Sequence, residues 1–160
     1  MLSLNITAEL AGVSELKTID LPTQPYEYSF KIQCTSCRDI HPNWVSINQF
    51  KRQDVPGGKG EANFVFKCRS CKRDSSINLK TTGNSYTEDK SGKPVTMLKL
   101  DCRGVEAVEF KAEGEFICKG LESNTEFKGV DLEEGEWYDY DEKAGDEVSI
   151  TEVKWEIIKS

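Results

Sequence analysis

The chain has 160 residues, with 21 basic and 28 acidic side chains and a formal net charge of −7. This length suits one compact unit or two small halves, and it is sufficient to bury a core without disulfides. The sequence shows neither an export leader nor an apolar run near the roughly 18 residues of a membrane span, so we expect a cytoplasmic or nuclear protein that enters no membrane.

Alternation between apolar and polar residues is frequent along the chain, whereas helical periodicity is scarce. This pattern predicts an all-β fold. Clusters of turn-forming residues separate the expected strands at 56–60, 82–85, 91–94 and 143–146. The strands are expected at residues 2–6, 26–32, 44–50, 63–67, 76–79, 97–100, 105–110, 115–118, 137–140 and 148–158.

A polar stretch at 81–94 divides the chain into two β-rich parts. We predict a single compact unit made of two similar halves packed together, approximately residues 1–82 and 95–160, with a linker at about 83–94. The first half would carry a metal site and the second none.

Two short echoes between the halves suggest a duplication. The segment 30–34 resembles 98–102, and the segment 60–71 resembles 135–145. Chance also produces echoes this short, so the duplication stays open. If it occurred, Cys102 would be the one remaining counterpart, in the second half, of the four cysteines of the first half.

Four cysteines stand in two identical dyads, Cys34-Thr-Ser-Cys37 and Cys68-Arg-Ser-Cys71. Two residues between thiolates allow a tight turn to direct both sulfurs at one point, and two such turns supply the tetrahedral sulfur shell of a structural zinc. In a reducing compartment such dyads are more often metal ligands or redox centres than disulfides. We therefore predict one Zn²⁺ per chain, bound by these four cysteines.

Thirty residues separate Cys37 from Cys68, more than in a compact double-dyad site. A hairpin with strands at 44–50 and 63–67 would explain this insert and predicts a zinc ribbon. Arg38 and Lys72 stand where a glycine often relaxes such a turn, which predicts backbone strain or a looser turn.

Redox chemistry is the main alternative for the dyads, because a Cys-x-x-Cys pair can cycle between dithiol and disulfide. Neither dyad precedes a convincing helix, as it does in thioredoxin-like sites, and two dyads suit one metal better than two redox centres. A catalytic zinc usually keeps an open position, whereas four thiolates close the shell, so we predict no enzyme and no catalytic residues. The one histidine, His41, is expected to have a surface or turn role.

Two further features have simple structural explanations. Cys102 and Cys118 have fifteen residues between them and are interpreted as buried small hydrophobic residues. The acidic run 131–142 lacks the spaced ligands of a calcium loop and is interpreted as a solvated strand edge protected by charge.

Charge is divided unevenly between the two halves. Residues 31–80 contain ten basic and four acidic side chains, a net +6, and residues 101–160 contain seven and 18, a net −11. Many of the basic residues flank the dyads, where they would offset the negative charge of a zinc with four thiolates. Phosphate binding usually needs a wider basic face, so we expect no nucleic-acid partner and instead a protein partner.

The dyads, the loop at 57–60 and the segments 102–106 and 137–144 together resemble the eukaryotic CXXC motif-containing zinc-binding proteins. The resemblance runs over nearly the whole chain. It implies an all-β protein of two similar halves with one zinc in the first half, and no established enzymatic activity. The metal ligands that it implies are the four cysteines that the spacing also indicates.

We therefore expect a zinc-binding protein with a structural four-cysteine site that acts as a protein-interaction or adaptor module. A thiol protein for metal handling or redox chemistry is the first alternative, and a nucleic-acid-binding zinc ribbon is the second.

Overall fold

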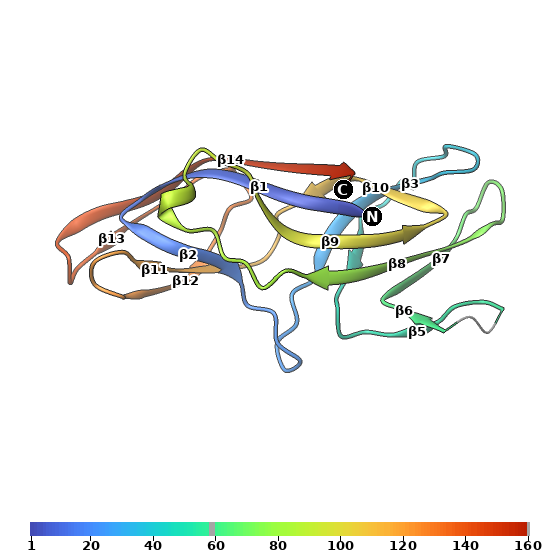
Figure 1. Ribbon diagram of the computed structural model, residues 1–160, viewed down its shortest axis with the longest axis horizontal. Helices are drawn as coiled ribbons and strands as arrows, with labels where there is room; N and C mark the ends of the chain where they lie inside the picture. The colour runs from blue at the N-terminus through green and yellow to red at the C-terminus, as the bar shows by residue number, and fades with distance from the viewer. Residues whose placement is uncertain (58–59, 160) are drawn as a thin grey trace.

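The computed structural model describes residues 1–57 and 60–159, and over this range the chain is all-β, as predicted (Figure 1). Its only helical element there is a short 3₁₀ turn, η1 (Glu88–Lys90), so no helix in the described part is long enough to cross a membrane. The strands are β1 (Leu2–Ala11), β2 (Val13–Thr18), β3 (Tyr28–Cys34), β4 (Val45–Ile47), β5 (Gln53–Asp54), β6 (Glu61–Ala62), β7 (Phe64–Lys67), β8 (Asp74–Thr81), β9 (Val95–Arg103), β10 (Val105–Lys111), β11 (Phe116–Gly120), β12 (Glu126–Val130), β13 (Trp137–Asp141) and β14 (Asp146–Lys159).

All ten strands expected from the sequence form, with shifted ends. The sequence pattern missed β2, β12 and the short pair β5 and β6. The turn predicted at 56–60 includes Gly58 and Lys59, which lie outside the described residues.

A six-stranded antiparallel sheet in the order β13-β14-β1-β9-β8-β7 runs along the molecule. Two three-stranded sheets, β10-β3-β4 and β12-β11-β2, pack against it through a shared hydrophobic core. Near the centre of the large sheet, β1 pairs with β14 and with β9. Strands from both halves of the chain are therefore interleaved at the centre of this sheet, where β1 lies between β14 and β9.

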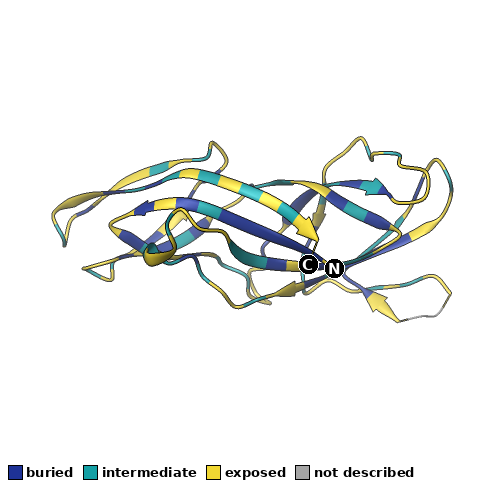
Figure 2. Cartoon of the chain, turned by 45° about the horizontal axis from the view of Figure 1, so that its top comes forward, coloured by how far each residue is buried: buried dark blue, intermediate teal, exposed yellow. Residues whose placement is uncertain are grey.

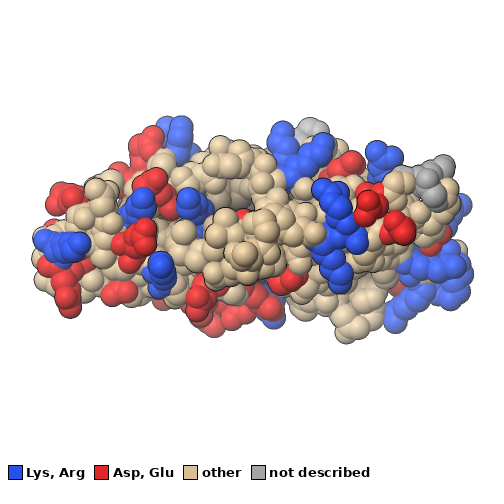
Figure 3. Space-filling view, turned by 90° about the horizontal axis from the view of Figure 1, so that it is seen from below, with Lys and Arg blue, Asp and Glu red and all other residues tan. Residues whose placement is uncertain are grey.

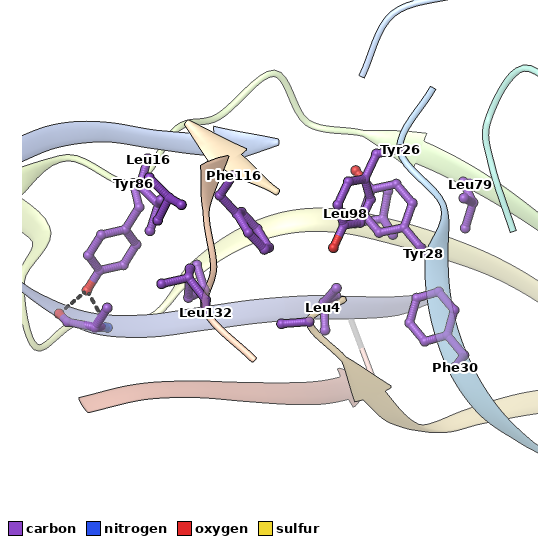
Figure 4. Close-up of a cluster of buried hydrophobic side chains, with 14 of the residues drawn as sticks. Leu4, Leu16, Tyr26, Tyr28, Phe30, Leu79, Tyr86, Leu98, Phe116 and Leu132 are labelled. Carbon is purple, nitrogen blue, oxygen red and sulfur yellow. Dashed lines mark hydrogen bonds between the residues drawn. The ribbon is translucent and has the colours of Figure 1, made fainter. Parts of the chain in front are cut away.

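The core is one continuous cluster of buried apolar side chains. β1 is buried along most of its length (Figure 2), and Leu4 and Ile6 are each 1% exposed. Burying such a side chain stabilises the fold by about 1.5–3 kcal/mol. Tyr86, from the segment expected to be a polar linker, is fully buried, and its hydroxyl lies 3.0 Å from the carbonyl oxygen of Ala8 on β1 (Figure 4).

The two halves contain corresponding strands that exchange places. β1 continues through Gly12 into β2, and β9 continues through Gly104 into β10. β2 then joins the sheet of β11 and β12, while β10 joins the sheet of β3 and β4. Each small sheet thus combines one strand from one half with two strands from the other.

The two connecting glycines are required by their backbone conformation and their surroundings. Gly12 has φ of 75° and Gly104 has φ of 77°, both in the left-handed region. A Cβ atom at Gly12 would lie 2.8 Å from Cγ1 of Val148, and one at Gly104 would lie 3.0 Å from Oγ of Ser75. Only glycine combines this conformation with so close an approach.

One of the two predicted echoes is in the wrong register. Because Gly104 takes the place of Gly12, β9 corresponds to β1 and not to β3. Cys102 therefore corresponds to Leu10 rather than to Cys34.

Candidate metal centre

Each cysteine dyad forms the turn after a strand. The first dyad begins at the end of β3, which pairs with β4 and β10, and the second joins β7 to β8. The predicted hairpin between the strands at 44–50 and 63–67 is not observed, because β4 pairs with β3 and β7 pairs with β8. The two turns are placed by separate sheets, and the packing of these sheets brings them together.

Both turns have the same backbone geometry. The N–H of Arg38 donates to the carbonyl of Cys34 at 3.0 Å, and the N–H of Lys72 donates to that of Cys68 at 2.9 Å. Arg38 and Lys72 have φ of 67° and 64°. The strain predicted for these non-glycine residues is thus present in the left-handed backbone, which costs an L-residue about 1–2 kcal/mol.

The turns bring the four predicted ligands into one cluster. The Sγ atoms of Cys34, Cys37, Cys68 and Cys71 all lie within 4.8 Å of one another. Two of the separations, Cys34 to Cys71 and Cys37 to Cys68, are 3.6 Å. Sulfurs at the corners of a regular tetrahedron with zinc–sulfur bonds of about 2.3 Å are about 3.8 Å apart, so the arrangement fits a tetrahedral metal ion.

Polar contacts link the two turns independently of any metal. Ser70 in the second turn donates its hydroxyl to Asp39 beside the first, at 3.0 Å, and Nε of Arg69 lies 3.5 Å from the same carboxylate. Arg73, at the end of the second turn, likewise donates to the hydroxyl of Ser36 in the first turn at 3.3 Å. Basic residues thus lie around the thiolates, as the sequence predicted.

Backbone N–H groups favour the thiolate form that metal binding requires. Hydrogen bonds from the N–H of Cys37 and then of Ser36 lower the pKa of Cys34 to about 6. The pKa of Cys68 is lowered first by the N–H of Cys71. The first cysteine of each turn therefore loses its proton more readily than an ordinary cysteine does.

The other candidate residues lie outside this cluster. His41 is half-exposed, and its ring packs edge-on against Phe66 with a centroid distance of 5.1 Å. Cys118 is buried in the core and Cys102 packs against it. Burial raises the pKa of Cys102 to about 11 and that of Cys118 to about 12, which disfavours the thiolate at both positions.

The second half repeats both turns without cysteines. The N–H of Asn124 donates to the carbonyl of Gly120 at 3.0 Å, and the N–H of Gly145 donates to that of Asp141 at 2.8 Å. Asn124 and Gly145 have φ of 57° and 72°, which place them in the same left-handed region as Arg38 and Lys72 in the first half. By position, the four ligands correspond to Gly120, Ser123, Asp141 and Ala144.

A hydrogen-bonded carboxylate lies where this second site would hold a metal. Asp141 is 1% exposed and accepts hydrogen bonds from the hydroxyl of Ser123 and, at 3.3 Å, from that of Thr125. It also accepts from the backbone N–H groups of Lys143 and Ala144, each at 3.2 Å. The sequence analysis missed this site, although the echo between the segments 60–71 and 135–145 pointed to the second of its two turns.

Comparison with known proteins agrees with the geometry of the cysteine site. The sequence model of the family described as CXXC motif containing zinc binding protein, eukaryotic, matches residues 3–158. The chain belongs to this family. A relative from Schizosaccharomyces pombe, UPF0587 protein C2D10.03c, is 43% identical over 158 residues, which cover 99% of this chain and 98% of that protein. The CXXC motif containing zinc binding protein of Bos taurus is 34% identical over 159 residues, with 99% and 98% covered.

Two solved structures share the fold over nearly the whole chain. A crystal structure of C1orf123 has a TM-score of 0.91 and 31% identity, with 99% of each chain covered. A hypothetical protein from Plasmodium falciparum has a TM-score of 0.87 and 25% identity, with 98% of each chain covered. The chain is therefore a member of a zinc-binding family, and its own four dyad cysteines are positioned to bind a metal ion.

Proposed function

We propose that this protein is a protein-interaction module, located in the cytoplasm or nucleus, in which one zinc ion bound by Cys34, Cys37, Cys68 and Cys71 braces one end of the fold. The observation that carries the proposal is the closed cluster of four sulfurs at the ends of two separate sheets. A zinc ion there would join the β3 and β7–β8 turns. Four thiolates leave no position for a water or a substrate, which favours a structural role over a catalytic one.

The distribution of charge supports a protein partner. Figure 3 shows charged side chains toward both ends of one face and a largely uncharged middle. The segment 31–80 has a net charge of +6 and the segment 101–160 has −11. Opposite fields on one small molecule favour oriented docking of another protein, whereas the acidic half would repel a nucleic-acid backbone.

Metal analysis tests the structural part of this proposal. We expect one zinc per chain in protein purified without chelators, and Cys68→Ser should lose that zinc. Cys102→Ser is the matched control: it should keep the zinc and cost about 1–3 kcal/mol, because it places a hydroxyl among apolar neighbours. Two metal ions per chain, or equal loss of zinc from both variants, would contradict the assignment.

One observation favours metal handling as a second function. Cys37 is an exposed residue and Cys71 a half-exposed one, so a competing ligand can approach this side of the site without unfolding the chain. A chromophoric zinc chelator distinguishes the two functions when zinc release and near-ultraviolet circular dichroism are followed together. A brace releases zinc only as the fold is lost, whereas a carrier releases it while the spectrum stays native.

A further inference from the structure

Two large aromatic side chains are exposed on β13, far along the sheet from the cysteine site (Figure 1). Tyr138 is 64% exposed and Tyr140 is 50% exposed. Their neighbours on the strand point to the other face, where Trp137 packs against Phe127 with a centroid distance of 5.5 Å and Asp141 is buried. The two tyrosines therefore share the outer face of the sheet and contribute little to its core.

The residues beside Tyr138 on the outer face of the sheet have small side chains. In the antiparallel register, Tyr138 lies opposite Ser149 on β14, and Ser149 lies opposite Ala11 on β1. These small side chains leave the ring of Tyr138 standing above its neighbours. β13 is also the edge strand of the six-stranded sheet, so the side of its backbone away from β14 has no neighbouring strand in the described structure.

The surroundings of the tyrosines are strongly acidic. Residues 131–152 contain ten acidic side chains and one basic side chain, Lys143. The hydroxyl of Tyr138 donates to Glu136 at 3.2 Å, and Tyr140 lies opposite Glu147 in the strand register. Among the described residues, none of the salt bridges involves this segment.

Charge on an edge strand commonly prevents unwanted pairing with other strands. Here the charge is all negative. It repels an acidic strand, including the same edge of a second copy of this protein, but it attracts a basic strand. Exposed tyrosine rings add a surface on which arginine or lysine side chains can stack. Edge protection alone explains the carboxylates, but it does not explain two exposed aromatic rings on the same face.

We propose that the β13 edge binds an extended basic segment of a partner protein, which adds a strand to the sheet and places arginine or lysine side chains at alternate positions over Tyr138 and Tyr140. The spacing follows from strand geometry, because side chains two residues apart point to the same face. Backbone hydrogen bonds would hold the segment, and the carboxylates of Glu136 and Glu147 would pair with its cations. This inference rests on the interaction role proposed above and names the chemistry of the partner.

Peptide binding tests the proposal on the full, zinc-loaded chain. The probe is a fluorescein-labelled nonapeptide that alternates threonine with arginine, and its comparison is an isomer with the same arginines in one block. At near-physiological salt we expect the alternating peptide to bind about tenfold more tightly, as fluorescence anisotropy would show. The double variant Tyr138→Ala/Tyr140→Ala should lose about tenfold in affinity, and Glu136→Gln/Glu147→Gln should also bind more weakly.

Matched controls separate this site from general attraction. Phe50→Ala removes an exposed aromatic ring from the basic half, and Glu61→Gln/Glu109→Gln removes two exposed carboxylates on β6 and β10; both should bind as the unmodified chain does. Equal affinity for the two peptides, or unchanged binding by the tyrosine variant, would overturn the proposal, as would self-association of the protein through this edge in sedimentation. Zinc content, measured on every variant, reports separately on the structural zinc, so the two proposals fail independently.

Discussion

Arg38 and Lys72 hold the backbone of the two cysteine turns in a conformation that suits glycine. Each follows the second cysteine of its dyad, and its N–H closes the turn on the first cysteine. The cost of this conformation is local, and a zinc ion bound to all four thiolates would offset it because metal binding is coupled to folding.

Replacing Arg38 with glycine should therefore stabilise the protein. We expect Arg38→Gly to raise the free energy of unfolding by about 1 kcal/mol, because glycine accepts a φ of 67° without steric cost. Urea unfolding of the zinc-loaded protein is the measurement. Thr35→Gly, in the same turn but outside the left-handed region, is the control and should be neutral or destabilising.

Asp141 is the residue on which the cysteine-free turns of the second half depend. Its hydrogen bond from Ser123, followed by those from the N–H of Ala144 and the hydroxyl of Thr125, lowers its pKa. An unfolded aspartate has its ordinary pKa of about 3.9, so the unfolded chain binds a proton more readily than the folded one. The contribution of Asp141 to stability is thus complete above that value and is lost as the pH falls through the lower, folded pKa.

Substitution of this carboxylate should remove a pH-dependent part of the stability. We expect Asp141→Asn to unfold at lower urea concentration than the unmodified chain at pH 7, and the difference between the two to shrink below about pH 4. Asp139→Asn changes an exposed carboxylate on the same strand and should have a small effect at both pH values. A difference that stays constant from pH 7 to pH 3 would contradict the role given to Asp141.

At the level of elements, the same turn is stabilised in two ways. The turns at 34–39 and 68–73 bring together four thiols, whereas those at 120–125 and 141–146 are joined by a carboxylate and hydroxyl groups. The first arrangement depends on an added ion and the second on side chains of the chain itself.

Removal of the metal should therefore affect one pair of turns only. After chelation we expect the amide hydrogens of residues 34–39 and 68–73 to exchange faster, because the thiolates lose their common ligand and repel one another. Those of residues 120–125 and 141–146 serve as an internal control and should keep their rates. Uniform acceleration across all four turns would show that the zinc end and the other end unfold as one unit.

How far the sequence predicted these elements depends on where their signals lie. Alternation and dyad spacing are local signals, and they located ten strands and the four sulfurs that the fold gathers. β2 and β12 were missed because their buried residues, Val13 and Leu16 in one and Phe127 and Val130 in the other, lie three positions apart. A register shift in each strand interrupts the alternation there. Tyr86 was read as part of a polar connection, since burial of one ring among polar neighbours has no periodic pattern.

Strand pairing between distant segments could not be derived from the same signals. Nothing in the local pattern shows that β4 pairs with β3 rather than with β7, or that β1 pairs with β9 and β14. These pairings depend on which surfaces bury most apolar area together, a property of the assembled core. The cysteine-free turns escaped detection for the same reason, because only the fold places Ser123 and Asp141 side by side.

The whole molecule is held together by the exchange of strands between its halves. Residues 1–82 lack β10, the neighbour of β3, and residues 95–160 lack β2, the neighbour of β11. Neither half alone contains the complete set of strands that either end of the molecule uses. The predicted division at residues 83–94 is thus crossed by the pairing of strands from its two sides.

Separate expression of the halves tests this interdependence. We expect residues 1–94, which keep the buried Tyr86, and residues 95–160 each to be largely unfolded by circular dichroism, even with zinc present, and to recover β structure and dispersed amide resonances when mixed in equal amounts. Native-like spectra from either piece alone would show that the exchanged strands β2 and β10 are dispensable for folding.

The position of β1 also has a consequence for synthesis on the ribosome. Its neighbours in the sheet are β9 and β14, so no partner strand for Leu2–Ala11 exists until residues 95–103 have been made. At translation rates of about 5–20 residues per second, a strand whose residues are mostly buried in the final fold waits roughly 5–20 s for its first neighbour. During that interval the nascent chain displays an apolar strand without its neighbours, and we expect the chaperones that act on emerging polypeptides to bind β1.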